Sequence, residues 1–128
     1  MLFRSPRHPM FESTYKENPI EQEAAATNGA VWVWPLMFYI ECALKLDGER
    51  FISHAEEMLA AFDENIQTYC IGSVAEYYDA NPPFSPRGAI SQAWSVGAVL
   101  YIKQLIEQYK AKAKRAAKRT AAKKSVKK

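Results

Sequence analysis

The sequence predicts an all-α chain with three main helices between residues 31 and 109 and a basic tail after them. Three observations support this fold class. Apolar residues recur at helical spacing in residues 49–69, an apolar stretch bounded by turn signals comes before them, and a second apolar stretch follows a proline-rich loop. At 128 residues the chain is long enough for one domain with a modest core and too short for two.

The first 27 residues predict an irregular lead-in. They contain Pro6, Pro9 and Pro19 and few periodic apolar positions. Because proline suits the first turn of a helix, a short helix can begin at Pro19.

The first main helix is expected from about Val31 to Leu46. Asn28-Gly29 is a turn signal before it, and Asp47-Gly48 ends it. Pro35 falls within the first turns, where a missing N–H costs nothing. The apolar face at 3.6-residue spacing consists of Leu36, Ile40, Ala43 and Leu44.

The second main helix is expected from Glu49 to about Tyr69, with one apolar stripe. A single stripe is typical of a helix that packs through one side only and faces solvent with the other, so we interpret it as an outer helix. The stripe consists of Phe51, Ala55, Met58, Leu59, Phe62 and Ile66.

A loop from Cys70 to Gly88 separates this helix from the third, which is expected from about Ala89 to Tyr109. The prolines at positions 82, 83 and 86 predict no regular structure in the second half of the loop. The first half of the third helix is apolar nearly all round, as in a helix enclosed on several sides. Such enclosure requires more neighbours than two other helices provide.

The net charge of +3 is the sum of two segments with net charges of opposite sign. Residues 110–128 hold ten Lys/Arg and no acid, whereas residues 1–109 hold seven basic and fourteen acidic residues. The tail is expected either to extend the third helix as a frayed end or to be disordered. It suits nonspecific binding of nucleic acid or another polyanion, although a purely solubilising role is an alternative, and it has no aromatic residue for base stacking.

Several classes of site and location are not indicated. The start shows no signal peptide, and the longest apolar run, Ala30 to Ile40, contains Pro35 and is well short of the ~20 residues that span a bilayer, so we expect a cytoplasmic protein. Cys42 and Cys70 suggest neither a disulfide framework nor a metal motif; both are expected as reduced thiols, with Cys42 buried. We expect no metal and no cofactor, since His8 and His54 lack ligand-spaced partners.

Two linked segments indicate a family. Glu76-Tyr77-Tyr78-Asp79 leads through Pro86-Arg87-Gly88 to a helix opening Gln92-Ala93-Trp94-Ser95. This segment resembles the end of the glucosidase domain of glycogen debranching enzymes, the amylo-α-1,6-glucosidases. Upstream, Asn28 to Leu36 resembles the Gly-x-Val-Trp-x-Trp element of the same family, and the resemblance covers about residues 3–108.

The resemblance implies a fold of the six-hairpin glycosidase type, an (α/α)6 toroid of twelve helices. Such a toroid needs roughly three times this length at about 11–12 residues per helix. Residues 1–109 would therefore correspond to the C-terminal portion of the toroid, with an inner, an outer and another inner helix. The tail, residues 110–128, lies outside the pattern of the family.

The resemblance also gives Glu76 the role of general base in an inverting α-1,6-glucosidase. Inversion needs a carboxylic acid about 6.5–9.5 Å away, on the other side of the sugar. The acid of the family lies upstream of everything in this sequence, and Asp79, three residues from Glu76 on one loop, is a poor substitute. The chain alone is therefore expected to be inactive.

Five further residues are candidates for sugar binding, each with a plainer alternative. An indole face matches a pyranose ring, but tryptophans at helix starts also serve as core residues. Gln92 suits sugar hydroxyls or the loop backbone, and Asp79 suits sugar binding or bracing of the loop, where Arg87 could clamp either Asp79 or Glu76. The candidates are Trp32, Trp34, Asp79, Gln92 and Trp94.

Three functions remain open. The first is a fragment or subunit of an α-1,6-glucosidase that acts on an α-glucan and needs a complementing polypeptide or self-association. The second is a non-enzymatic helical interaction protein whose basic tail binds nucleic acid or an acidic partner. The third is a free-standing subunit that docks onto a separate chain. An exposed face on the inner helices would favour association, and we expect it from Trp32, Leu36, Trp94, Val96 and Leu100.

Overall fold

A computed structural model describes residues 6–125 and confirms an all-α fold with three main helices. Residues 1–5 of the expected lead-in and residues 126–128 of the tail lie outside the described part. The elements in order are α1 Pro19–Asn28, β1 Val31–Trp32, α2 Pro35–Asp47, the 3-10 turn η1 Gly48–Phe51, α3 Ile52–Thr68, β2 Tyr77–Tyr78, β3 Pro86–Arg87 and α4 Ala93–Ser125.

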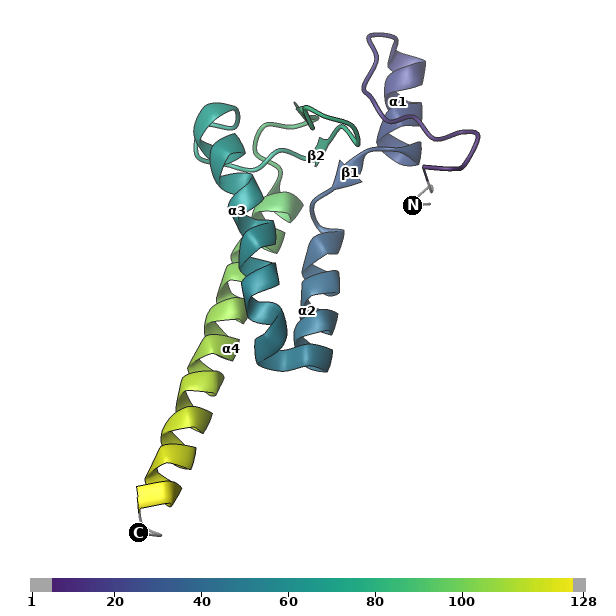
Figure 1. The fold of residues 1–128 in the computed structure, drawn as a ribbon. Helices are drawn as coiled ribbons and strands as arrows, with labels where there is room; N and C mark the ends of the chain where they lie inside the picture. The colour runs from purple at the N-terminus through teal and green to yellow at the C-terminus, as the bar shows by residue number, and fades with distance from the viewer. Residues whose placement is uncertain (1–5, 126–128) are drawn as a thin grey trace.

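The body of the molecule is a bundle of α2, α3 and α4, with the three short strands at one end of it (Figure 1). Ile40 and Leu44 of α2 and Ile102 of α4 are fully buried at its centre. Each large apolar side chain buried in this way contributes roughly 1.5–3 kcal/mol to folding. The remaining core members include Ala55 and Leu59 of α3 and Val99 and Ile106 of α4.

The expected short helix at Pro19 is present as α1. Asn18 caps it, because its Oδ1 accepts a hydrogen bond from the Ile20 N–H at 3.1 Å. Figure 1 shows α1 at the start of β1, on the side away from the bundle and apart from the three main helices.

The first main helix begins later than the sequence suggests. Val31–Trp32 pair with Tyr77–Tyr78 as antiparallel strands, so α2 starts at Pro35 and not at Val31. The strand partner lies far away in the sequence and overrides the local helical pattern. At the other end the helix stops at Gly48, which has φ +58° and is thus in the backbone region that favours glycine.

The expectation of no regular structure around the loop prolines is wrong at one point. Pro86–Arg87 form β3, which pairs with β2 on one side only. Proline is tolerated on an edge strand because its missing N–H interrupts no second ladder. The third main helix correspondingly starts at Ala93 and not at Ala89, since the Ala89 carbonyl accepts the Glu76 N–H at 3.1 Å and ties this residue to the loop.

The basic stretch continues α4 as helix to Ser125, the last residue described. Alanine, lysine and arginine are all strong helix formers, and cations near a helix C-terminus are favoured by its dipole. Cys42 lies exposed on α2, contrary to the expected burial, while Cys70 is buried, and both are free thiols.

An exposed apolar face remains on the bundle, although its membership differs from the expected one. Trp94 and Leu100 of α4 are exposed as expected, whereas Trp32, Leu36 and Val96 are partly covered. Phe38 on α2 and Tyr101 on α4 are exposed as well. Tyr101 lies two turns from Trp94 on the same side of α4, and Phe38 and Trp94 both meet Trp34 edge to face, so Phe38, Trp94 and Tyr101 define the exposed face.

We expect the isolated chain to associate through this face or to bind a hydrophobic dye, because large contiguous apolar patches are rare on monomers. Light scattering coupled to size exclusion should show oligomers that dissociate in the double variant Phe38→Gln/Trp94→Gln. Leu46→Gln, at an exposed position near the end of α2, is the control and should change nothing. A monodisperse monomer without dye binding would contradict this prediction.

Candidate functional site

The strands bring together the two segments that resemble the debranching-enzyme motifs. β2 lies between β1 and β3, so Trp32 is paired with Tyr77, and Tyr77 with Arg87. The rings of Trp32 and Tyr77 lie 5.0 Å apart. The indole N–H of Trp32 donates to the Ala26 carbonyl at 2.7 Å, which fixes this ring between α1 and β2.

Glu76, immediately before β2, is fixed through its backbone and its side chain. Its carbonyl accepts a hydrogen bond from the Ser95 hydroxyl in the first turn of α4, at 3.1 Å. Its carboxylate Oε2 accepts the Ala89 N–H at 3.0 Å. Within residues 6–125 the other oxygen, Oε1, has no hydrogen-bond partner, so the carboxylate is oriented on one side and open on the other.

The carboxylate of Glu76 is held directly against the backbone of Gly88. Gly88 has φ +72°, and a Cβ at this position would lie 2.5 Å from Glu76 Oε2 and 2.8 Å from Glu76 Cβ. Only glycine permits both the backbone conformation and the approach. The position of the candidate base therefore depends on this residue.

Asp79 follows β2 and is buried as an ion pair with Arg87. Its Oδ2 accepts from Arg87 Nη2 at 2.8 Å and from Arg87 Nε at 3.1 Å, and its Oδ1 accepts the Tyr15 N–H at 2.9 Å. The hydrogen bond to Asp79 raises the pKa of Arg87 above its usual range. Both oxygens of Asp79 are thus engaged in bracing the loop, and its role in sugar binding stays a prediction.

Ser13 and Tyr15 of the lead-in hold this loop in place, and we refer to this segment as the strap. The sequence analysis does not predict these contacts. The Ala80 N–H donates to the Ser13 carbonyl and the Asn81 amide to the Ser13 hydroxyl, both at 2.8 Å. The Arg87 guanidinium lies over the Tyr15 ring, 5.1 Å from its centroid. No periodicity or motif distinguishes Ser13 or Tyr15, so no signal in the sequence could have found them.

Gln92 caps α4 with its side chain. Its Oε1 accepts the backbone N–H groups of Trp94 at 2.6 Å and Ser95 at 3.0 Å. This is the backbone-binding alternative for Gln92, and it orients the helix turn on which Trp94 and Ser95 lie. The amide nitrogen of Gln92 donates to none of the described residues.

The tryptophans form two separate groups. Trp34 meets Trp94 edge to face with ring centroids 6.3 Å apart, whereas Trp32 contacts Tyr77. Trp94 is 66% exposed and thus offers an open indole face. Trp32 also lines an apolar groove of about 260 Å³ together with Val31, Val33, Pro35, Leu36, Tyr39, Phe62 and Tyr78.

The described residues offer no cluster of three His, Cys, Asp or Glu side chains that could hold a metal ion. Nor does any helix in that part of the chain combine the length and apolar character needed to cross a membrane. What the described site does present is the oriented carboxylate of Glu76, close to the aromatic residues Trp32 and Tyr77.

Residues 2–101 match the family model described as Amylo-alpha-1,6-glucosidase, so the match covers more than half of the chain. The chain therefore belongs to this family of glycoside hydrolases, as the two motifs suggest. No curated protein and no solved structure gives a significant match. The family match ends within α4, before the basic stretch begins.

Proposed function

We propose that this chain supplies the base-bearing side of an α-1,6-glucosidase site, with Glu76 as general base. In this role Glu76 takes a proton from the water that attacks the anomeric carbon of an α-1,6-linked glucosyl residue on an α-glucan. The observation that carries the proposal is the orientation of the carboxylate, with Oε2 on the Ala89 N–H and Oε1 open. Membership of the family supports the reaction class.

The site is incomplete without a second carboxyl group. An inverting enzyme needs its acid about 6.5–9.5 Å from the base, on the other side of the sugar. Asp79 does not fill this role, because Tyr15 and Arg87 occupy both of its oxygens. The acid comes in this proposal from further helices of an (α/α)6 toroid, which pack against α2 and α4, and the chain alone is inactive.

The sugar is held by indole faces. Trp94 is the first choice because its ring is exposed and because it directly precedes Ser95, whose hydroxyl donates to the Glu76 carbonyl. Trp32 lines the apolar groove beside β2, and Trp34 supports Trp94 from the edge. Gln92 positions the Trp94 turn and keeps its amide N–H groups for a sugar hydroxyl.

Complementation tests the role of Glu76. The chain is mixed with a debranching-enzyme glucosidase domain truncated just before its own Gly-x-Val-Trp element, and release of glucose from an α-1,6-glucosyl branch stub is measured. We expect no activity from either part alone and hydrolysis from the mixture. Glu76→Gln should remove this activity and leave assembly intact, because glutamine keeps the shape but cannot take a proton.

The control is Glu49→Gln, on the exposed turn between α2 and α3, which should behave like the parent chain. Hydrolysis by the isolated chain would refute the missing acid, and full activity of the complemented Glu76→Gln variant would refute the base. The non-enzymatic alternative predicts no hydrolysis in any combination while the basic stretch still binds its partner.

A further inference from the structure

The end of α4 forms an isolated basic rod, which we name the basic arm and define as residues 111–125. It continues past the turn that joins α2 and α3 and has no other element beside it in Figure 1. At 1.5 Å per residue the arm is about 22 Å long. It holds seven Lys/Arg, no acid and no aromatic residue.

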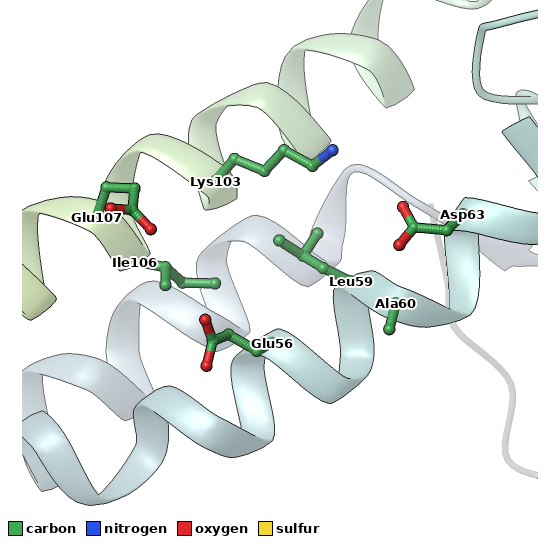
Figure 2. Close-up of a pocket in the computed structure, with 7 residues that line it drawn as sticks. All are labelled: Glu56, Leu59, Ala60, Asp63, Lys103, Ile106 and Glu107. Carbon is green, nitrogen blue, oxygen red and sulfur yellow. The ribbon is translucent and has the colours of Figure 1, made fainter.

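The ion pairs of the body end where the arm begins. Lys110 contacts Glu56 of α3 at 2.5 Å and Glu107 of its own helix at 2.9 Å. These two acids line a groove of about 360 Å³ between α3 and α4, in which Figure 2 shows Leu59 and Ile106 between the helices. Glu107 is the last acid in the sequence, so no carboxylate of the arm itself can neutralise the cations that follow.

The charges of the arm are arranged in a stripe. Lys112, Arg115 and Arg119 follow each other at intervals of three and four residues and therefore share one helix face. Lys118 lies beside them, one step round the helix. Ala113, Ala117 and Ala121 follow each other at intervals of four on another face, which also carries Lys114. Residues 111–122 are exposed apart from the half-buried Ala113.

Three candidate partners do not fit this arm. A membrane-surface helix needs large apolar side chains opposite its charges, and the described arm offers only alanine and lysine there. A glucan is uncharged and gives the cations no counter-ion. Single-stranded nucleic acid is disfavoured as well, since it is bound by aromatic stacking and the arm has no aromatic residue.

We propose that the basic arm binds the phosphate backbone of duplex nucleic acid without sequence preference. Duplex DNA carries one charge per about 1.7 Å of axis, and its major groove admits an α-helix. The arm has no Asn, Gln, Asp or Glu with which to read adenine or cytosine, and in this proposal its Lys and Arg side chains pair with phosphates. The body holds seven basic and fourteen acidic residues, so the phosphates repel it. The contact with nucleic acid is therefore confined to the arm.

Binding should also strengthen the helix of the arm. Like charges three and four residues apart, such as Arg115 and Arg119, each destabilise a helix by about 0.2–0.5 kcal/mol. A polyanion neutralises them and removes this repulsion. An increase in helical circular dichroism on adding duplex is thus expected, in addition to the binding signal.

Fluorescence anisotropy of the full chain with two labelled 20-base-pair duplexes of unrelated sequence tests the proposal. We expect equal affinities and a slope of log K against log salt of about −4.5 to −6.3, as about −0.9 per phosphate predicts for five to seven contacts. The variant with Lys112, Arg115, Lys118 and Arg119 all changed to Gln keeps helix propensity but loses four charges. Its slope should shrink by about 3 to 4, with at least a tenfold loss of affinity at low salt.

The matched control is Lys112→Arg/Lys118→Arg, which keeps the charge and should bind like the parent chain. Unchanged binding by the four-fold Gln variant, a preference for one duplex sequence or insensitivity to salt would overturn the proposal. Tighter binding to phosphatidylserine vesicles or to a poly-glutamate peptide than to the duplex would overturn it also. Glu76→Gln should bind duplex normally, so this test is independent of the glucosidase proposal.

Discussion

Replacing Asp79 with alanine is expected to lower the free energy of unfolding by about 2–3 kcal/mol. The change leaves the Tyr15 N–H and the Arg87 guanidinium without their acceptor, and an unsatisfied partner of a charged hydrogen bond costs about this much. Because the Arg87 side chain is 31% exposed, water can partly solvate it, and the loss stays below that of a fully buried pair. Urea denaturation followed by circular dichroism measures the change.

The same substitution should release residues 13–15 of the lead-in, which hold the loop through Ser13 and Tyr15. Hydrogen exchange of the Ala80 N–H, which donates to Ser13, is expected to accelerate along with that of Tyr15. Asp79→Asn keeps one acceptor oxygen, so its stability should lie between those of the parent chain and Asp79→Ala. The control is Asp63→Ala, at an exposed position of α3, which should leave stability unchanged. A stability equal to that of the parent chain would show that Asp79 does not brace the loop.

The sequence predicts the three main helices because their signals are local. The stripe from Phe51 to Ile66 and the apolar first half of α4 specify helix without reference to distant residues. The errors lie where pairing is non-local. Val31 and Trp32 become a strand only because Tyr77 and Tyr78 lie beside them.

The candidate site is predicted to a different extent for each residue. The motifs point to Glu76 as the candidate base, and this role stays a prediction. For Asp79 and Gln92 the sequence offers two alternatives each, sugar binding or a contact within the protein, and both side chains make hydrogen bonds within the protein. The strap stayed hidden because its bonds join residues more than sixty positions apart, as between Tyr15 and Asp79. A lead-in that contains prolines and lacks apolar periodicity does not predict such contacts.

Gly88→Ala is expected to displace the Glu76 carboxylate and to destabilise the fold by about 1–3 kcal/mol through its positive φ. The new Cβ would lie 2.5 Å from Oε2, so the hydrogen bond from Ala89 to Glu76 cannot persist in its present geometry. Activity in the complementation assay should therefore fall nearly as far as in Glu76→Gln. Thermal unfolding and glucose release measure the two effects separately.

Two other glycines separate backbone strain from the contact with Glu76. Gly72 has φ +85° with nothing within 4 Å of a new Cβ, so Gly72→Ala should cost strain alone and leave complemented activity intact. Gly97 lies in α4, and a Cβ added there would meet nothing within 4 Å. Because alanine has a higher helix propensity than glycine, Gly97→Ala should raise the free energy of unfolding by up to about 1 kcal/mol. If Gly88→Ala lost no more activity than Gly72→Ala, the approach of Gly88 to Glu76 would have no part in placing the base. A selective loss at Gly88 would instead tie the orientation of the carboxylate to the reaction.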